Sequence, residues 1–239
     1  MKSGITGPLF KLFGSKWSAS KHYPAPEYDT IVEPFAGSAG YSLRHYHKSV
    51  ILAEKNEHVY NLWNWLINDA TEDDIRSIPL NLKEGMDIRE LGMSDGQNLL
   101  LKNWQRTNNV GNCWTISPWG NKPGQWTEST RSRVAEQFQY IKHWKVYKDS
   151  KDVYNSSEST WFVDPPYFAN YKYKTTVDYE DLGRTCSNLR GQVIVCEATC
   201  PKTQENPNWL PFSSFRRTVT SRRKADNNHH SNELIWTNK

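Results

Sequence analysis

Long apolar runs are missing from this 239-residue sequence. Hydrophobic residues make up 36% of it and the mean hydropathy is −0.81. No segment approaches the roughly 20 apolar residues that a membrane-spanning helix needs. The N-terminal stretch Met1–Trp17 contains lysines but no continuous apolar run, so it does not resemble a secretory signal. We therefore expect one main domain, without a membrane anchor, in the cytoplasm.

Cysteine is also scarce, with four residues in the whole chain. Four cysteines in a chain of this length do not form a disulfide scaffold, and a reducing compartment would keep them as thiols. Cys196 and Cys200 have no second ligand pair in register with them, so we expect no metal site. Buried small residues are the favoured interpretation of these cysteines.

The net charge is only +4, but the charges are unevenly distributed. Residues 69–90 contain seven acidic and three basic residues, whereas residues 102–148 contain eight basic and two acidic residues together with five tryptophans. Basic groups interleaved with aromatic rings suit a surface that neutralises phosphates and stacks on bases. The tryptophans could equally fill a small core of their own, and both interpretations stay open.

The first clear structural pattern is an α/β unit. Thr30–Val32 predicts a strand that leads into a glycine-containing turn, and Gly40–His47 could begin a helix. A second strand, Val50–Ala53, ends at the acidic residue Glu54, and helical spacing follows in His58–Asn68. This order of strand, glycine turn, helix, strand and acidic residue is typical of the start of a nucleotide-binding unit. A dehydrogenase would show the same order.

The middle of the chain lacks a regular alternation of strand and helix. We therefore interpret residues 69–148 as an inserted, mainly helical target-recognition region, flanked by a catalytic domain of residues 1–68 and 149–239. One amphipathic helix is expected within residues 126–144. After the insertion, the pattern predicts a strand, a helix, a strand and a hairpin around a basic loop; these correspond to Trp161–Val163, residues 178–191, residues 192–198, and Phe215–Thr220 paired with Glu233–Trp236.

The strongest chemical signal is Asp164-Pro165-Pro166-Tyr167, directly after an apolar strand. The exocyclic amine of a base is a poor nucleophile because its lone pair is delocalised into the ring. The Asp164 carboxylate and the Pro165 carbonyl can accept its hydrogens and favour the geometry needed for attack. The prolines hold that carbonyl in place, and Tyr167 offers a face on which a flipped base can stack. An ordinary strand-ending turn is the structural alternative.

Five segments together resemble the Dam-like family of DNA adenine methyltransferases. They are, in the order of that family, PLFKLFGSKW, IVEPFAGSAGYS, ILAEKNEHVYNLWNWL, VYKDSKDVYN and WFVDPPYF. The resemblance covers about a third of the chain. It implies a Rossmann-like methyltransferase sheet, S-adenosylmethionine as cofactor, and transfer of its methyl group to the exocyclic amine of a flipped adenine in double-stranded DNA. It further suggests a short palindromic target such as GATC, as in restriction-modification systems, and an origin in bacteria or phage.

The resemblance also implies roles for individual residues. Lys16 and Trp17 match the region that helps bind the methionine end of the cofactor, Glu54 matches the ribose-binding acid, and Asp149 matches the acid near the cofactor's adenine. The full set of expected cofactor-binding residues is Lys16, Trp17, Glu33, Pro34, Phe35, Ala36, Gly37, Ser38, Glu54, Asp149, Ser150 and Asp164. The chain departs from the family pattern at Ser15, where a second glycine is usual, and at Ser150, where an aromatic ring often stands.

Candidate DNA contacts come from two basic regions. Lys122, Trp126, Arg131 and Arg133 lie in the expected insertion, where a solvated helix face is the alternative. The second region is a terminal cluster without an intervening acid, for which phosphate contact is favoured: Arg216, Arg217, Arg222, Arg223 and Lys224.

Three other functions remain open from the residues alone. Methylation of the cytosine amine shares the same chemistry, and so does methylation of RNA or of a free nucleotide. A nucleic-acid-binding protein that has lost the reaction is the third alternative. Methylation of a cytosine ring carbon is not expected, because it requires a cysteine nucleophile and none of the four cysteines follows a proline or adjoins a glycine loop.

Overall fold

The computed structural model describes residues 4–105, 113–118, 120–154, 157–167, 177–198, 216–223 and 230–238. Its centre is a seven-stranded sheet in the order β3-β2-β1-β4-β5-β7-β6. The strands are β1 (Thr30–Glu33), β2 (Ser49–Ala53), β3 (Lys145–Tyr147), β4 (Ser159–Val163), β5 (Gly191–Ala198), β6 (Arg216–Arg223) and β7 (His230–Thr237). The first five pair in parallel, and β7 runs antiparallel to both β5 and β6. The predicted α/β fold with a Rossmann-like sheet is confirmed.

The described helices and helical turns are three to eleven residues long. They are η1 (Ser20–His22), η2 (Ser42–His45), α1 (Glu57–Asn64), η3 (Trp65–Asp69), α2 (Glu72–Ser77), η4 (Ile88–Leu91), α3 (Asp95–Gln105), α4 (Glu128–Gln137), η5 (Phe138–Ile141), η6 (Ser150–Asp152) and α5 (Tyr179–Asn188). The helix expected after the glycine turn is only the single 3₁₀ turn η2, because the chain enters β2 at Ser49 soon after it.

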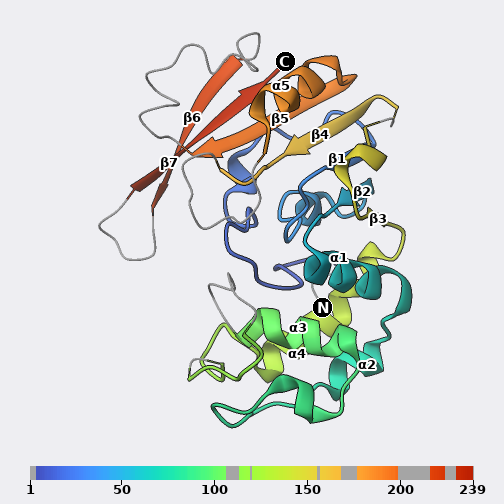
Figure 1. Cartoon of the computed structure of the whole chain (residues 1–239), viewed down its shortest axis with the longest axis vertical. Coiled ribbons are helices and arrows are strands. Elements are labelled where there is room, and N and C mark those ends of the chain that lie inside the picture. The colour runs from blue at the N-terminus through green and yellow to red at the C-terminus, as the bar shows by residue number, and fades with distance from the viewer. Residues whose placement is uncertain are drawn as a thin grey trace.

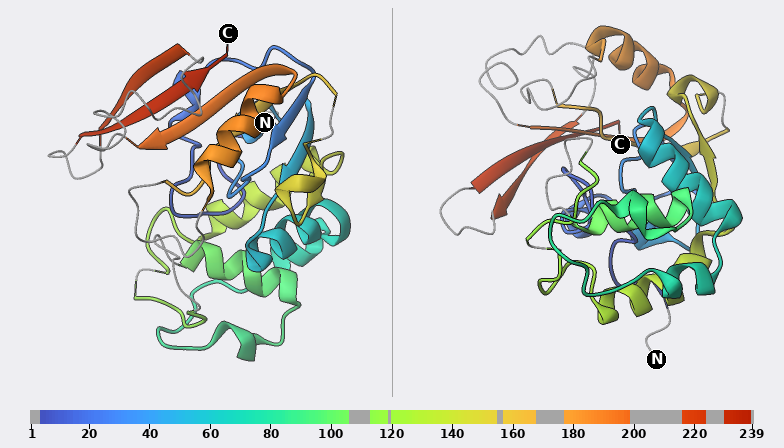
Figure 2. Two further views of the ribbon diagram at one scale, coloured as in Figure 1. Left: turned by 45° about the horizontal axis from the view of Figure 1, so that its top comes forward. Right: turned by 60° about the horizontal axis from the view of Figure 1, so that its bottom comes forward.

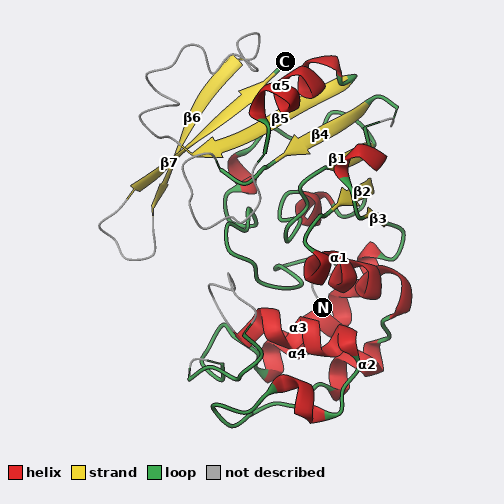
Figure 3. Ribbon diagram, viewed as in Figure 1, coloured by secondary structure: helices red, strands yellow, loops and turns green. Residues whose placement is uncertain are grey.

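Residues 57–141, which we call the helical lobe, lie between β2 and β3 in the sequence. Figure 1 shows α2, α3 and α4 gathered at one end of the molecule, away from α5 and the β6–β7 hairpin. Figure 3 shows helices and loops, and no strand, among the described residues of this lobe. In both views of Figure 2, the lobe (cyan to yellow-green) remains separate from the hairpin (red).

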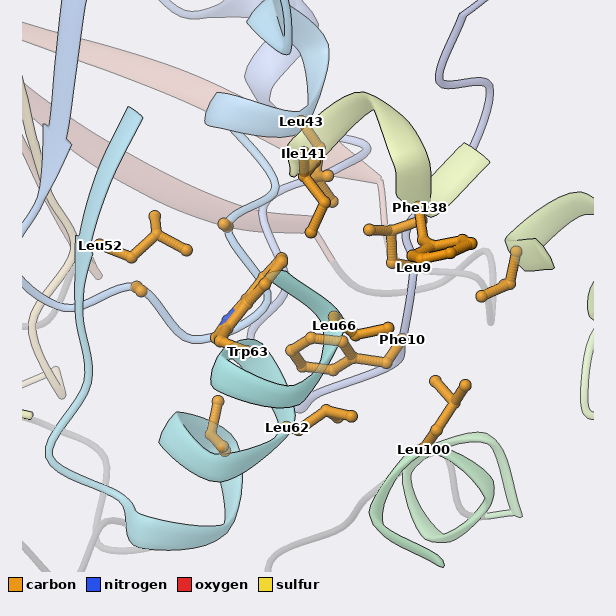
Figure 4. Packing of buried hydrophobic residues seen from close by; sticks show 14 of the residues in the cluster. Leu9, Phe10, Leu43, Leu52, Leu62, Trp63, Leu66, Leu100, Phe138 and Ile141 are labelled. Carbon is orange, nitrogen blue, oxygen red and sulfur yellow. The ribbon is translucent and has the colours of Figure 1, made fainter. Parts of the chain in front are cut away.

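One hydrophobic core joins the sheet to the helical lobe. Alternate strand residues such as Ile31 and Leu52 face α1, where they pack in the same cluster as Trp63, Leu100 and Phe138. Figure 4 shows Leu52, Trp63 and Phe10 converging there, with Leu100 and Phe138 reaching in from the lobe. The neighbouring strand residues face the opposite side of the sheet, where Val32, Trp161 and Val195 pack against Leu182 and Cys186 of α5.

Two boundaries differ from the sequence-based prediction. Strand β3 belongs to the sheet, although Lys145–Tyr147 was included in the expected insertion. It is an edge strand in which two of the three residues are exposed, so it carries no apolar run. Arg222 and Arg223 lie in strand β6 and not in a loop, because the hairpin extends to the Arg223–His230 pair. Among the described residues, none of the helices combines the length and the apolar character that crossing a bilayer demands.

Candidate active site

A cavity of about 700 Å³ opens at the carboxyl ends of β1, β2 and β4. This edge is where α/β sheets bind ligands. Of the expected cofactor-binding and catalytic residues, only Trp17 and Tyr167 do not line it; those that do are Lys16, Glu33, Pro34, Phe35, Ala36, Gly37, Ser38, Glu54, Asp149, Ser150, Asp164, Pro165 and Pro166. Residues far apart in the sequence therefore meet in one space.

The glycine turn after β1 is held from both sides. The backbone N–H of Gly37 donates to Glu54 Oε2 at 2.8 Å, and the Gly37 carbonyl accepts a 2.8 Å hydrogen bond from Trp63 Nε1 of α1. Gly37 has a φ of +48°, a backbone conformation that glycine adopts without strain. The turn is therefore fixed by the end of β2 and by α1 before any ligand arrives.

The N-terminal segment packs directly against this turn. A Cβ atom at Gly40 would lie 2.3 Å from the backbone nitrogen of Trp17, so only glycine allows this approach. Ser38 Oγ is 2.8 Å from Ser15 Oγ, and Ser20 Oγ donates to the Gly40 carbonyl at 3.1 Å. Ser15, which stands where the family usually has glycine, therefore takes part in joining the segment to the turn.

Lys16 carries this segment into contact with the end of β4. Its side chain is 6% exposed, and Nζ lies 2.8 Å from Asp164 Oδ1. The same ammonium lies 4.6 Å from the ring centroid of Tyr167 and 3.3 Å from the Gly14 carbonyl. Tyr167 thus lies beside the cavity although it does not line it. A mostly buried ion pair of this kind fixes the position of the Asp164 carboxylate.

Two further carboxyl groups are held by backbone N–H groups. Glu54 accepts from Gly37 through Oε2 and from Asn56 through Oε1, both at 2.8 Å. Burial raises the pKa of Glu54, and these two hydrogen bonds partly oppose the rise. Glu33 Oε1 accepts from the Ser42 N–H at 2.8 Å. Burial raises the pKa of Glu33 to about 8, the Ser42 hydrogen bond and Lys16 oppose the rise, and Asp164 adds to it.

The cavity is also lined by residues that the sequence did not single out. Among them are Asp178 and Asp181 at the start of α5, with Leu182 and Tyr154. Asp178 is the N-cap of α5 and accepts from the Asp181 N–H at 3.0 Å. A short acidic residue before an amphipathic helix is a recognisable capping signal, but it does not reveal that the helix start faces a ligand site. Asp149 similarly caps η6 by accepting from the Lys151 N–H at 2.9 Å.

Trp17 supports the cavity without lining it. Its ring lies 4.3 Å from the Arg44 guanidinium, and Arg44 Nε donates to the Trp17 carbonyl at 2.8 Å. These contacts fasten the turn that delivers Lys16.

The DNA candidates in the helical lobe divide into exposed and internal residues. Trp126 is 1% exposed and packs near Trp104, so its ring belongs to the core and not to a DNA-stacking surface. Arg131 donates to the Ile78 carbonyl and to Glu128, both within the lobe. The Arg133 guanidinium lies 5.6 Å from the Trp104 ring centroid, and burial lowers its pKa. Lys122 is exposed.

For the terminal cluster, the structure describes the backbone of β6, which contains Arg216, Arg217, Arg222 and Arg223. Lys224 and Cys200 lie outside the described residues. Cys186 and Cys196 are buried in the core, as the sequence indicated, whereas Cys113 is only partly buried. In the described ranges, no three His, Cys, Asp or Glu side chains form a group that could hold a metal ion.

Comparison with known proteins adds three findings. A family model described as D12 class N6 adenine-specific DNA methyltransferase matches residues 14–90. No curated protein matches the chain. Two solved structures align over most of it: precorrin 8w decarboxylase from Methanobacterium thermoautotrophicum, at 10% identity and a TM-score of 0.39, covers 88% of this chain and 82% of its own. A candidate RNA methyltransferase from Pyrococcus horikoshii, at 11% identity and a TM-score of 0.39, covers 93% and 78%.

TM-scores of 0.39 are too low to carry a conclusion, so the class rests on the sheet and the family match. A largely parallel sheet with a glycine turn after β1 and an acid after β2 defines a Rossmann-like nucleotide-binding fold, and the family match points to the methyltransferases within it. The matched segment contains Lys16, the glycine turn and Glu54. A D12 class N6 adenine-specific DNA methyltransferase domain is thus detected over residues 14–90, the part of the chain that holds the glycine turn and the acid after β2.

Proposed function

We propose that this enzyme transfers a methyl group from S-adenosylmethionine to the exocyclic amine of an adenine swung out of double-stranded DNA. The observation that carries the proposal is that Asp164, Pro165 and the glycine turn line one cavity. The family match ends at residue 90, so the Asp164 turn supports the proposal independently of it. The resemblance to Dam-like enzymes makes GATC the first target to test.

The residues of the cavity suit this cofactor in charge and shape. Six carboxylic acids and three lysines line it, an acidic balance that favours a ligand with a positively charged sulfur. The glycine turn allows close approach of a ligand to the backbone. In this proposal, Lys16 and the turn from Glu33 to Ser38 hold the methionine end, Glu54 receives the ribose hydroxyls, and Asp149 and Ser150 lie beside the adenine. When bound, the cofactor supplies a methyl group that a nitrogen lone pair can attack.

The Asp164 turn would bind the target amine. The Asp164 carboxylate and the Pro165 carbonyl accept its two hydrogens, which withdraws the nitrogen lone pair from the ring and directs it at the methyl carbon. As the nitrogen–methyl bond forms, the methyl–sulfur bond would break and leave a neutral thioether, and the amine would lose one proton, for which Asp164 is the nearest acceptor in the proposal. In the structure, Lys16 Nζ lies 2.8 Å from this carboxylate. Tyr167 would stack on the extruded base.

The DNA would be bound by the helical lobe and the terminal hairpin. We propose that the expected insertion without strand β3, residues 69–144, supplies the target-recognition region, with exposed Lys122 as a phosphate contact. The arginines of β6 are the second candidate phosphate-binding group. Extruding a base costs a few kcal/mol, which these contacts must offset.

One experiment tests the proposal directly. Duplex DNA containing GATC sites is incubated with the protein and methyl-labelled S-adenosylmethionine, digested to nucleosides and separated. We expect the label in N6-methyl-2′-deoxyadenosine. Mapping the modified bases then gives the target sequence. Label in N4-methylcytosine would reassign the substrate base, and preferential labelling of RNA in a parallel reaction would reassign the nucleic acid. Absence of label from every substrate would refute transfer and leave a binding function.

A further inference from the structure

The Asp164–Tyr167 turn poses an anchoring problem that the glycine turn does not. Pro165 and Pro166 have no backbone N–H, so neither proline can be held as Gly37 is held, through its own amide hydrogen. The proline rings fix φ at both positions and Pro166 restricts ψ at Pro165, but ψ at Pro166 remains adjustable and decides where the Pro166 carbonyl points. An anchor on the prolines must therefore act through their carbonyl oxygens or through the neighbouring residues.

Tyr179 supplies such an anchor from α5. Its hydroxyl donates a hydrogen bond to the Pro166 carbonyl. Tyr179 is the first residue of α5 and directly follows the N-cap Asp178, so its backbone is held by the helix start. Its ring packs against the hydrophobic cluster beneath α5. The hydroxyl is thus aimed at the turn by two independent constraints.

The turn is therefore held at both ends by side chains from other elements. Lys16 of the N-terminal segment holds the Asp164 carboxylate at 2.8 Å, and Tyr179 holds the Pro166 carbonyl. The Pro165 carbonyl lies between these two anchors. With the Pro166 carbonyl fixed, rotation of the Pro165–Pro166 unit is restricted, and so is the direction of the Pro165 carbonyl.

We propose that Tyr179 is a positioning residue for methyl transfer, which holds the Asp164–Pro166 turn in the orientation that grips the target amine. The inference rests on the proposed function of that turn. Tyr179 does not line the cavity, so it acts through Pro166 and not on the substrate. Small displacements of groups that orient a reacting atom reduce the rate of the chemical step far more than they reduce ligand affinity.

The test compares two tyrosine-to-phenylalanine substitutions that each remove a hydrogen bond to a proline carbonyl. Tyr179→Phe removes the bond to Pro166. Tyr41→Phe is the matched control, because the Tyr41 hydroxyl donates to the Pro24 carbonyl at 2.9 Å and neither residue lines the cavity. Phenylalanine at position 41 keeps the stacking on Phe162, whose ring centroid is 4.4 Å away.

Three quantities are measured for both variants: the single-turnover rate of methyl transfer, the dissociation constant of S-adenosylmethionine, and the melting temperature. We expect Tyr179→Phe to lower the single-turnover rate by about tenfold while cofactor affinity stays near that of the wild type. Tyr41→Phe should keep the wild-type rate. A wild-type rate in Tyr179→Phe would overturn the inference, and so would equal losses of rate in the two variants, which would indicate a general structural effect.

A readout that does not depend on activity separates this inference from the proposed function. The Tyr167 amide is the first backbone N–H after the two prolines, so its hydrogen exchange reports on the order of the turn. We expect its exchange to accelerate in Tyr179→Phe and not in Tyr41→Phe. Unchanged exchange would overturn the anchoring role even if the wild type methylated DNA. Accelerated exchange in Tyr179→Phe, found together with a wild-type protein that transfers no methyl group, would refute the proposed function and leave the anchoring role intact.

Discussion

The two ends of the cavity hold their carboxylates by different means. At the glycine turn, Glu54 and Glu33 accept backbone N–H groups of Gly37, Asn56 and Ser42. At the end of β4, the Asp164 turn is held by the side chains of Lys16 and Tyr179. Backbone anchors persist as long as the fold does, whereas a side-chain anchor can be removed by one substitution. The comparison predicts that single substitutions act most selectively on catalysis at the Asp164 end.

Asp164→Ala is expected to have the largest effect. Removing the carboxylate abolishes the main acceptor for the target amine, and we expect the single-turnover methylation rate to fall about a thousandfold or more. Binding of S-adenosylmethionine, measured by calorimetric titration, should remain largely intact because the glycine turn is unchanged. Retained turnover would show that the Asp164 end is not the reacting end.

Lys16→Met should have the next largest effect, because it removes the cation that holds the Asp164 carboxylate. We expect a rate loss of about a hundredfold in the same assay. Lys48→Met is the matched control: Lys48 pairs with Asp29 at 3.0 Å, but Asp29 is fully exposed. Exposed pairs contribute about 0–1 kcal/mol to stability, so the control should keep its rate. Equal methylation rates in Lys16→Met and Lys48→Met would show that the Lys16 side chain is not needed to hold the Asp164 carboxylate.

Gly40→Ala tests the glycine-turn end, where we expect changes in stability and cofactor affinity together. The added Cβ would meet the Trp17 nitrogen at 2.3 Å and the Lys16 carbonyl carbon at 2.7 Å, which forces the N-terminal segment away from the turn. The cost should be about 1–3 kcal/mol in urea unfolding, with weaker cofactor binding.

Gly92→Ala provides the comparison for that substitution. Gly92 has a φ of +68° and open space around it, so the cost, about 1 kcal/mol, comes from its backbone angle alone. Its cofactor affinity should not change. A Gly40→Ala protein that binds the cofactor as tightly as Gly92→Ala does would contradict the close packing described here.

Glu33→Gln should change the pH dependence of stability. Burial raises the Glu33 pKa from 4.5 to about 8, so between these values the folded protein holds a proton that the unfolded chain has released. Stability from this group is complete below about pH 4.5 and is lost as the pH rises towards 8. The slope is at most about 1.4 kcal/mol per pH unit. Denaturant midpoints measured from pH 5 to 9 should decline less steeply in Glu33→Gln, and identical slopes would contradict the buried neutral acid.

The sheet was largely predictable from the sequence, because buried parallel strands carry short apolar runs. Thr30–Val32, Val50–Ala53 and Trp161–Val163 are such runs, and each coincides with a strand. Strand β3 was not predicted, because its exposed residues make its sequence resemble that of a loop. Trp126 was ambiguous for a different reason, since tryptophans among basic residues suit both a core and a nucleic-acid surface.

The residues of the candidate site were predictable, but several of their contacts were not. Motif resemblance indicated both Lys16 and Asp164, yet no local pattern states that their side chains meet, because this depends on the fold between them. The contact between Tyr179 and the Asp164 turn was not predicted at all. A tyrosine at a helix start carries no signal of its partner, and its hydrogen bond to Pro166 depends on how α5 packs on the sheet.

The pairing of Lys16 with Asp164 also has a consequence for folding during synthesis of the chain. A growing chain has completed β1, β2 and the helical lobe well before the strand that carries Asp164 is synthesised. Until then, the amino group at position 16 lacks the counter-ion that accompanies its burial in the finished protein. A truncated translation product ending before residue 164 would retain the glycine turn but would lack the acid proposed to perform the reaction.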